Sequence, residues 1–206
     1  MSRVRIKMCG MARADDARAA ADAGVDAIGM VFWSGSPRGR TRAEGAAIAR
    51  HVPPLVARVG VFVNETPDIV EACVSAMGLS AVQLHGDEDL AAYRSVRVPL
   101  IRAVSLVTND DVTRALALPL DVTVLVDAHS DTRRGGTGAM ASWSHAAAVA
   151  AVRPVILAGG LTPENVAAAI RAVRPWAVDV SSGVESAPGV KDVARMLAFV
   201  AAVRSV

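Results

Sequence analysis

Cys9 and Asp127 each end an apolar run in this 206-residue sequence, and both side chains can take part in acid–base chemistry. Cys9 follows Val4–Met8 and precedes a glycine, whereas Asp127 follows Val124–Val126. A thiolate is a reactive group, and a protonated carboxyl is a general acid. The structural alternatives are a small buried apolar role for Cys9 and a cap on a loop N–H group for Asp127. On these grounds both residues are candidates for catalysis.

Lys7 lies two positions before Cys9, so both side chains point to the same face of an extended strand. A buried cation there would lower the pKa of the Cys9 thiol, which makes Lys7 a candidate for tuning that group. The alternative is a structural ion pair between Lys7 and a carboxylate such as Asp179. To act as an acid near pH 7, Asp127 must stay protonated, and a low dielectric and a nearby substrate anion would both favour its neutral form.

Two glycine-bearing segments near the C-terminus indicate a phosphate site. Gly159-Gly160 follows one apolar run, and Ser181-Ser182-Gly183 follows the next. Glycines let the backbone approach an anion, and the N–H groups at a helix start are donors with partial positive charge. Thr162 and Pro163 predict a helix that begins directly after Gly160-Leu161. The alternative is that these glycines only permit tight turns.

Four further polar residues are candidates for substrate contacts. Gln83 and His85 share a face where a strand ends, and Asp179 lies near the end of the last strand. His85 could line the substrate, donate a hydrogen bond or serve structure. Arg38 follows Ser36-Pro37, and its guanidinium could bind a carboxylate or be solvated. His51 and His129 lack the spacing to join His85 in a metal site, so we predict no metal site there.

The elements that must position these residues alternate between short β-branched runs and longer Ala-rich segments. Such alternation predicts a parallel sheet covered by helices, and eight units predict a single (β/α)₈ TIM barrel of the phosphate-binding type over residues 1–206. A doubly wound open sheet is the alternative, but its G-x-G-x-x-G fingerprint is absent after the first strand. The predicted strands are Val4–Met8, Ala27–Phe32, Ala57–Val63, Ala81–Leu84, Leu100–Val104, Val122–Val126, Val155–Leu157 and Ala177–Val180. The predicted helices include Ala12–Ala23, Arg42–Arg50, Pro67–Met77, Asp87–Val96 and Pro163–Val173.

Composition excludes several classes of protein. Hydrophobic residues make up 52% of the chain, which excludes a disordered polypeptide. The net charge is +2 and the sequence contains no basic block, so we expect no nucleic-acid partner. Two cysteines 64 positions apart predict no disulfide framework, and no apolar run is long enough to span a membrane. We expect a soluble cytoplasmic protein with a small-molecule substrate and no membrane partner, as a monomer or homodimer.

In their order along the chain, the motifs at the predicted strand ends resemble the phosphoribosylanthranilate isomerase family. The resemblance covers almost the whole chain. The motifs are Lys7-Met8-Cys9-Gly10, Ser36-Pro37-Arg38, Gly60–Asn64, Gln83-Leu84-His85-Gly86-Asp87-Glu88, Gly135-Gly136-Thr137-Gly138, Ala158-Gly159-Gly160-Leu161 and Asp179–Glu185.

The resemblance implies an Amadori rearrangement in tryptophan biosynthesis, without metal or cofactor. N-(5-phosphoribosyl)anthranilate would become 1-(2-carboxyphenylamino)-1-deoxyribulose 5-phosphate. The resemblance makes Asp127 the general acid and Cys9 the general base. It also implies that Arg38 binds the anthranilate carboxylate and that the loops at Gly159-Gly160 and Ser181-Ser182 bind the phosphate.

One segment departs from the family pattern, and other functions have to be weighed. After Gly138 the family continues with Lys and Phe-Asp-Trp, whereas this chain reads Ala139-Met140-Ala141-Ser142-Trp143. We expect altered contacts of that loop with activity retained. The alternatives are another sugar-phosphate enzyme of the phosphate-binding barrels and a non-catalytic barrel.

Overall fold

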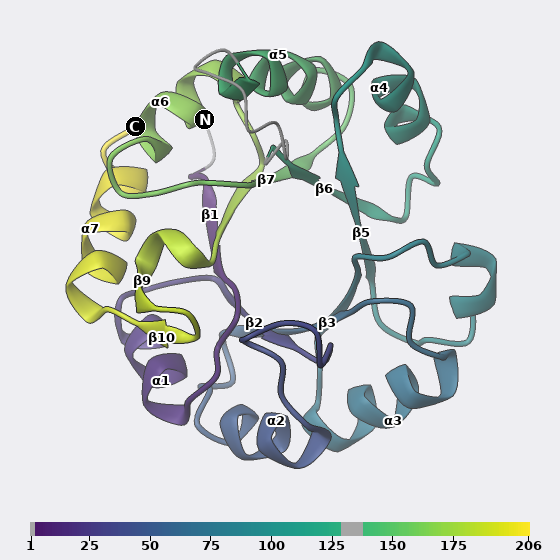
Figure 1. The fold of residues 1–206 in the computed structure, drawn as a ribbon, viewed down its shortest axis with the longest axis vertical. Helices are drawn as coiled ribbons and strands as arrows, with labels where there is room; N and C mark the ends of the chain where they lie inside the picture. Colours follow the sequence, from purple (N-terminus) through teal and green to yellow (C-terminus); the bar gives the residue numbers. More distant parts are fainter. Residues whose placement is uncertain (1–2, 129–137) are drawn as a thin grey trace.

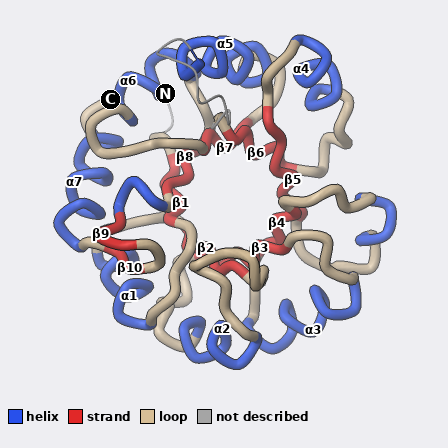
Figure 2. The backbone as a smooth tube through the Cα atoms, in the orientation of Figure 1, coloured by secondary structure: helices blue, strands red, loops and turns tan. Residues whose placement is uncertain are grey.

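The computed structural model describes residues 3–128 and 138–206, which form a closed barrel of eight parallel strands surrounded by helices (Figures 1 and 2). Neighbouring strands pair in chain order, and β1 pairs with β8 to close the ring. The open-sheet alternative is therefore wrong. The strands are β1 Arg5–Met8, β2 Ala27–Val31, β3 Ala57–Phe62, β4 Ala81–Leu84, β5 Leu100–Ser105, β6 Thr123–Asp127, β7 Val155–Ala158 and β8 Ala177–Val180.

The helices lie outside the barrel, as Figure 2 shows in blue around the red strands. None of the helices in the described ranges has the length and apolarity needed to cross a membrane. They are α1 Ala14–Asp22, α2 Arg42–Ala49, α3 Pro67–Met77, α4 Asn109–Leu116, α5 Gly138–Ala150, α6 Val166–Val173 and α7 Val193–Arg204, with 3₁₀ turns η1 Leu90–Tyr93 and η2 Ser182–Val184. A hairpin of β9 Glu185–Ala187 and β10 Val190–Lys191 follows β8.

The apolar residues of the strands form two cores because successive side chains point to opposite faces. The larger core lies between strands and helices and contains Phe62, Leu157 and Phe199, all fully buried. A smaller cluster fills the barrel interior and contains Leu125 and Ile156. The interior is therefore packed, and a ligand site can form only where the strands end.

Two predicted helices differ from the structure. The prediction for Asp87–Val96 is wrong, because only the turn η1 forms there. The buried carboxylate of Glu88 accepts from the N–H groups of Asn64 and Gly86 and thereby fixes an irregular loop. The predicted helix start at Pro163 is also wrong, since α6 begins at Val166 after a turn in which the Asn165 side chain accepts from the Thr162 N–H group. The Gly135-Gly136-Thr137 part of one motif, with His129, lies outside the described residues.

Candidate active site

A cavity of about 560 Å³ lies at the carboxyl ends of the barrel strands. Residues from seven of the eight strands or the loops after them meet there, although they are far apart in the sequence. Among the predicted site residues, those that line this cavity are Cys9, Arg38, Gln83, His85, Asp127, Gly159, Gly160, Asp179, Ser181 and Ser182. Lys7 lies one layer deeper along β1, and Gly183 supports the loop behind the cavity.

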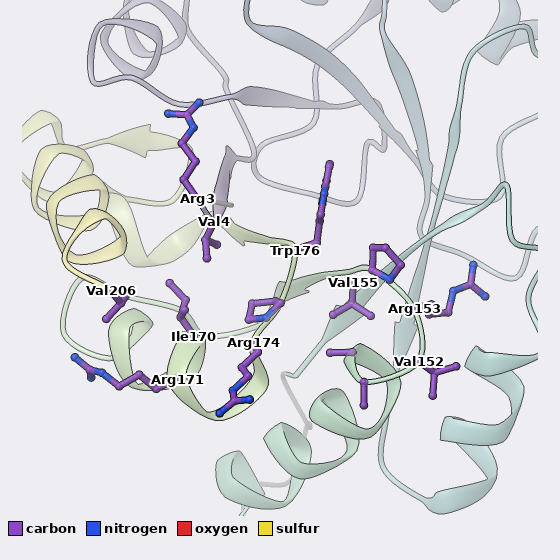
Figure 3. A pocket seen from close by; sticks show the side chains of 14 residues that line it. Arg3, Val4, Val152, Arg153, Val155, Ile170, Arg171, Arg174, Trp176 and Val206 are labelled. Atoms are coloured by element: carbon purple, nitrogen blue, oxygen red, sulfur yellow. The ribbon is translucent and has the colours of Figure 1, made fainter. Parts of the chain in front are cut away.

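A second, larger cavity of about 780 Å³ lies at the amino-terminal ends of the strands (Figure 3). Its wall includes Trp176, over which the Arg5 guanidinium stacks at 4.4 Å from the ring centroid. The Arg153 side chain there is committed to structure, since it donates to the carbonyls of Leu118, Pro119 and Val122. The predicted catalytic and substrate residues all lie at the opposite end of the barrel.

Lys7 forms a buried ion pair with Asp179, whose Oδ2 lies 2.7 Å from Lys7 Nζ. The alternative that Lys7 pairs with Asp179 is thus confirmed. The Lys7 amine is also close to the Cys9 thiol, because a side chain at Gly29 would meet both Cys9 Sγ at 2.8 Å and Lys7 Nζ at 3.2 Å. Asp179 Oδ1 is buried and has no hydrogen-bond partner among the described residues.

The expected lowering of the Cys9 pKa is wrong. Burial raises the pKa of the Cys9 thiol, and the nearby Lys7 ammonium only opposes that rise. For Lys7 itself, burial favours the neutral amine, but the attraction of Asp179 and Cys9 outweighs it and raises the pKa of the ammonium. The buried Cys9 thiol therefore holds its proton more tightly than a thiol in water does.

Asp127 and His85 face each other across the cavity mouth from β6 and the end of β4. His85 Nε2 lies 3.7 Å from Asp127 Oδ2, and both side chains are about one-third exposed. Gln83 Nε2 lies 3.1 Å from His85 Nδ1 and orients the imidazole ring. Asp127 is thus accessible to a ligand, and Cys9 lies on another wall of the same cavity.

Arg38 is held in place, so the alternative of a merely solvated guanidinium is wrong. Its Nε and Nη2 atoms donate to the two carboxylate oxygens of Glu185 at 2.7 and 2.6 Å. Glu185 raises the pKa of Arg38 through these hydrogen bonds. Gly10 adopts φ +77°, and a side chain there would overlap the Arg38 stem, which explains a glycine directly after Cys9.

Sequence reasoning did not single out Glu185 and Lys191, which contact Arg38 and the Ser181 loop. Lys191 Nζ donates to Glu185 Oε1 at 2.8 Å and to the Ser181 carbonyl at 3.0 Å. Burial lowers the pKa of Lys191, and the nearby Glu185 carboxylate opposes that lowering. The only signal in the sequence was the position of Glu185 directly after the Ser181–Val184 segment, because the hairpin that carries both residues was not predicted.

The two glycine-bearing loops lie against each other beside the cavity. Gly159 and Gly160 have φ values of +89° and +62°, a region that L-residues rarely adopt. Asn165 Nδ2 donates to the Gly160 carbonyl at 2.9 Å and fixes that turn. A side chain at Gly183 would overlap the carbonyl oxygen of Leu161, so the close approach of the two loops requires glycine. Within the described ranges, no cluster of three or more His, Cys, Asp and Glu residues could hold a metal ion.

Comparison with known proteins gives a consistent result. The family model described as N-(5'phosphoribosyl)anthranilate (PRA) isomerase matches residues 6–202. The N-(5'-phosphoribosyl)anthranilate isomerase of Myxococcus xanthus is 48% identical over 98% of this chain and 97% of its own length. That of Pseudomonas aeruginosa strain UCBPP-PA14 is 45% identical over 100% of this chain and 97% of its own.

Solved structures agree with the sequence comparisons. Phosphoribosyl anthranilate isomerase from Thermotoga maritima superposes with a TM-score of 0.89 at 39% identity, covering 98% of this chain and 100% of that one. A phosphoribosyl anthranilate isomerase in complex with reduced 1-(o-carboxyphenylamino)-1-deoxyribulose 5-phosphate gives a TM-score of 0.84 at 38% identity, with the same coverage. This chain belongs to the N-(5'-phosphoribosyl)anthranilate isomerase family.

Proposed function

We propose that this chain, an isomerase of tryptophan biosynthesis by family, catalyses the Amadori rearrangement of N-(5-phosphoribosyl)anthranilate with Asp127 as general acid and Cys9 as general base. The observation that carries this proposal is the placement of both groups on the wall of one cavity beside the two glycine-bearing loops. The reaction needs a proton donor at an oxygen and a base at a carbon, and these residues supply one of each.

The proposed steps keep atoms and electrons in balance. The Asp127 carboxyl gives its proton to the furanose ring oxygen while the C1′–O bond breaks, and the nitrogen lone pair forms a protonated Schiff base. The Cys9 thiolate then removes the C2′ proton, and the electron pair of that C–H bond moves through C1′ to the nitrogen. The resulting enolamine tautomerises to the ketone, so the product is an isomer of the substrate.

The electrostatics of Cys9 support its role as a base. A thiol whose pKa burial has raised is a stronger base when ionised, and the Lys7 ammonium beside it stabilises the thiolate. Lys7 is itself held by Asp179, so the cation does not need to move. The C2′ proton next to a protonated Schiff base is acidic enough for such a group to remove it.

The remaining lining residues fit the other parts of the substrate. Arg38, fixed by Glu185, would take the anthranilate carboxylate. The loops of Gly159-Gly160 and Ser181-Ser182, supported by Gly183, would bind the phosphate. Gln83, His85 and Asp179, which line the cavity, would contact the sugar.

The first test is the decay of phosphoribosylanthranilate fluorescence, with the substrate generated in situ. Wild-type protein is expected to accelerate the decay, and Cys9→Ser and Asp127→Asn are each expected to lower kcat by about 10²- to 10⁴-fold with little change in affinity. Cys73→Ser is the matched control, because Cys73 is a residue of α3 that is buried in the core, and it does not line the cavity.

Each outcome has a clear meaning. No acceleration by wild-type protein would refute the proposed reaction and favour another sugar phosphate or a non-catalytic barrel. Acceleration that survives Cys9→Ser would remove Cys9 from its proposed role.

A monomer or homodimer stays the prediction for assembly, and one similar structure is of monomers generated from a dimeric enzyme of Thermotoga maritima.

A further inference from the structure

A chain of three charged side chains runs inward from the cavity wall. Arg38 is 21% exposed and faces the cavity, whereas the side chains of Glu185 and Lys191 are 4% and 0% exposed. Glu185 accepts two hydrogen bonds from Arg38 and one from Lys191, all between 2.6 and 2.8 Å. Buried charges are expensive unless they are paired with good geometry, and these are paired.

The hairpin after β8 brings this chain of charges together. Glu185 is the first residue of β9 and Lys191 is the last residue of β10, and the two lie opposite each other in the antiparallel pairing. The backbone N–H group of Lys191 also donates to buried Asp16 of α1 at 3.3 Å. The eight β/α units close without this hairpin, which joins the cavity wall through Glu185 to α1 through Lys191.

The sum of the three charges is favourable for binding an anion. An Arg38–Glu185 pair alone would be neutral, but Lys191 adds a positive charge and leaves the group at +1. The two hydrogen bonds to Glu185 also fix the plane of the guanidinium, which has five N–H groups and so retains donors for a ligand. A planar, pre-oriented fork matches a carboxylate.

Lys191 also reaches the loop after β8. Its Nζ donates to the carbonyl of Ser181, a residue that lines the cavity. One fully buried ammonium therefore connects the Ser181 loop, predicted to bind phosphate, with the group around Arg38, predicted to bind a carboxylate.

We propose that Glu185 and Lys191 are positioning residues, of which Glu185 sets the Arg38 guanidinium for the ring carboxylate and Lys191 keeps that group cationic and holds the Ser181 loop for the phosphate. The inference rests on the proposed function, in which Arg38 takes the carboxylate of the substrate.

Binding of two probes tests this inference. The first is reduced 1-(o-carboxyphenylamino)-1-deoxyribulose 5-phosphate, and the second is the same compound without the ring carboxylate. Arg38→Met and Glu185→Gln are each expected to lower the affinity for the first probe by about tenfold to a hundredfold. The affinity for the second probe is expected to stay within about twofold of wild type. The Arg38→Met/Glu185→Gln double variant is expected to bind the first probe no more weakly than Arg38→Met, because Glu185 acts through Arg38.

Lys191→Met is expected to lower the affinity for both probes, because it removes a charge from the Arg38 group and the hydrogen-bond donor that holds the Ser181 loop. If that variant fails to fold, Lys191→Gln takes its place, since it removes the charge and retains an N–H donor group. Arg153→Met is the matched control for loss of a buried charge at the other end of the barrel, and both probes are expected to bind it as they bind wild type.

The failures can be told apart. The positioning role is overturned if Glu185→Gln lowers the affinity for both probes equally or for neither. It is also overturned if the loss of affinity caused by Glu185→Gln adds to the loss caused by Arg38→Met. The same holds if Lys191→Met, once shown to be folded, binds both probes as wild type does. If Arg38→Met itself does not distinguish the probes, or wild type binds neither, it is the proposed function that fails, and the inference falls with it.

Discussion

Lys7 and Asp179 lie opposite each other in the register of β1 and β8, the strand pair that closes the barrel, and their side chains form an ion pair of 2.7 Å. The pair therefore connects the first strand to the last in the interior of the barrel, directly beneath Cys9. Both side chains are almost fully buried, so each charge depends on the other.

Replacing Lys7 by Met is expected to destabilise the protein by about 3–5 kcal/mol, because it leaves the Asp179 carboxylate buried without its partner. Urea unfolding measures the change. The Lys7→Met/Asp179→Asn double variant should recover part of the loss. Arg3→Ala is the control, since Arg3 forms an exposed pair with Asp26 that should contribute no more than about 1 kcal/mol. A Lys7→Met protein as stable as Arg3→Ala would contradict this prediction.

The Cys9 thiol is expected to react with iodoacetamide only as the pH rises above the usual thiol range, because burial raises its pKa. A Cys73→Ser background removes the other cysteine. Adding Lys7→Met should move the curve to still higher pH, since Lys7 is the group that opposes the rise. The folded protein holds this proton more tightly than the unfolded chain, so the stabilising contribution is present below the unfolded pKa and is lost as pH rises through the folded one. Half-maximal reaction below about pH 8 would contradict the direction of the shift.

Glu88→Gln is expected to cost about 3 kcal/mol of stability, because the Glu88 side chain is fully buried and pairs with Arg102 at 2.7 Å. The same carboxylate accepts from the backbone N–H groups of Asn64, in the loop after β3, and of Gly86, directly after His85. Denaturation gives the stability change, and the KM of the proposed substrate reports the loop. Glu44→Gln is the control. Glu44 is exposed at the start of α2, and a glutamine can still accept from the Thr41 N–H group of the capping box, so neither quantity should change appreciably.

The barrel and most of its site could be predicted from sequence because periodicity and chain order carry that information. Strand ends such as Cys9, Asp127 and Ser181 meet in space once eight parallel strands close, whatever the side chains in between. The ion pair that fixes Arg38 could not be predicted in this way. Its partner Glu185 is 147 residues away along the chain and reaches it through a hairpin too short to show a pattern.

The sign of the Cys9 pKa shift shows a second limit of sequence reasoning. The position of Lys7 on the same face as Cys9 was predicted from strand alternation and is consistent with the structure. How deeply the thiol is buried depends on packing from other strands, including the absence of a side chain at Gly29, and that burial outweighs the nearby cation. Proximity can be derived from a local pattern, whereas desolvation is a property of the assembled barrel.

Gly183→Ala is expected to separate the two phosphate-site loops, because the added methyl group would overlap the backbone carbonyl of Leu161 and neither group is a flexible side-chain end. We expect a stability loss of about 1–3 kcal/mol and weaker competitive inhibition by inorganic phosphate. Gly24→Ala is the matched control. It introduces the same methyl group at a residue with φ +86°, where no other described residue lies within 4 Å, so it carries backbone strain without a steric clash.

The comparison of these two variants isolates the role of the loop contact. Both should lose stability, but only Gly183→Ala should raise the inhibition constant of phosphate, because only there does the displaced backbone belong to the predicted anion site. If both variants bind phosphate as wild type does, the glycines after β7 and β8 merely permit tight turns, and the phosphate of the substrate must be bound elsewhere in the cavity.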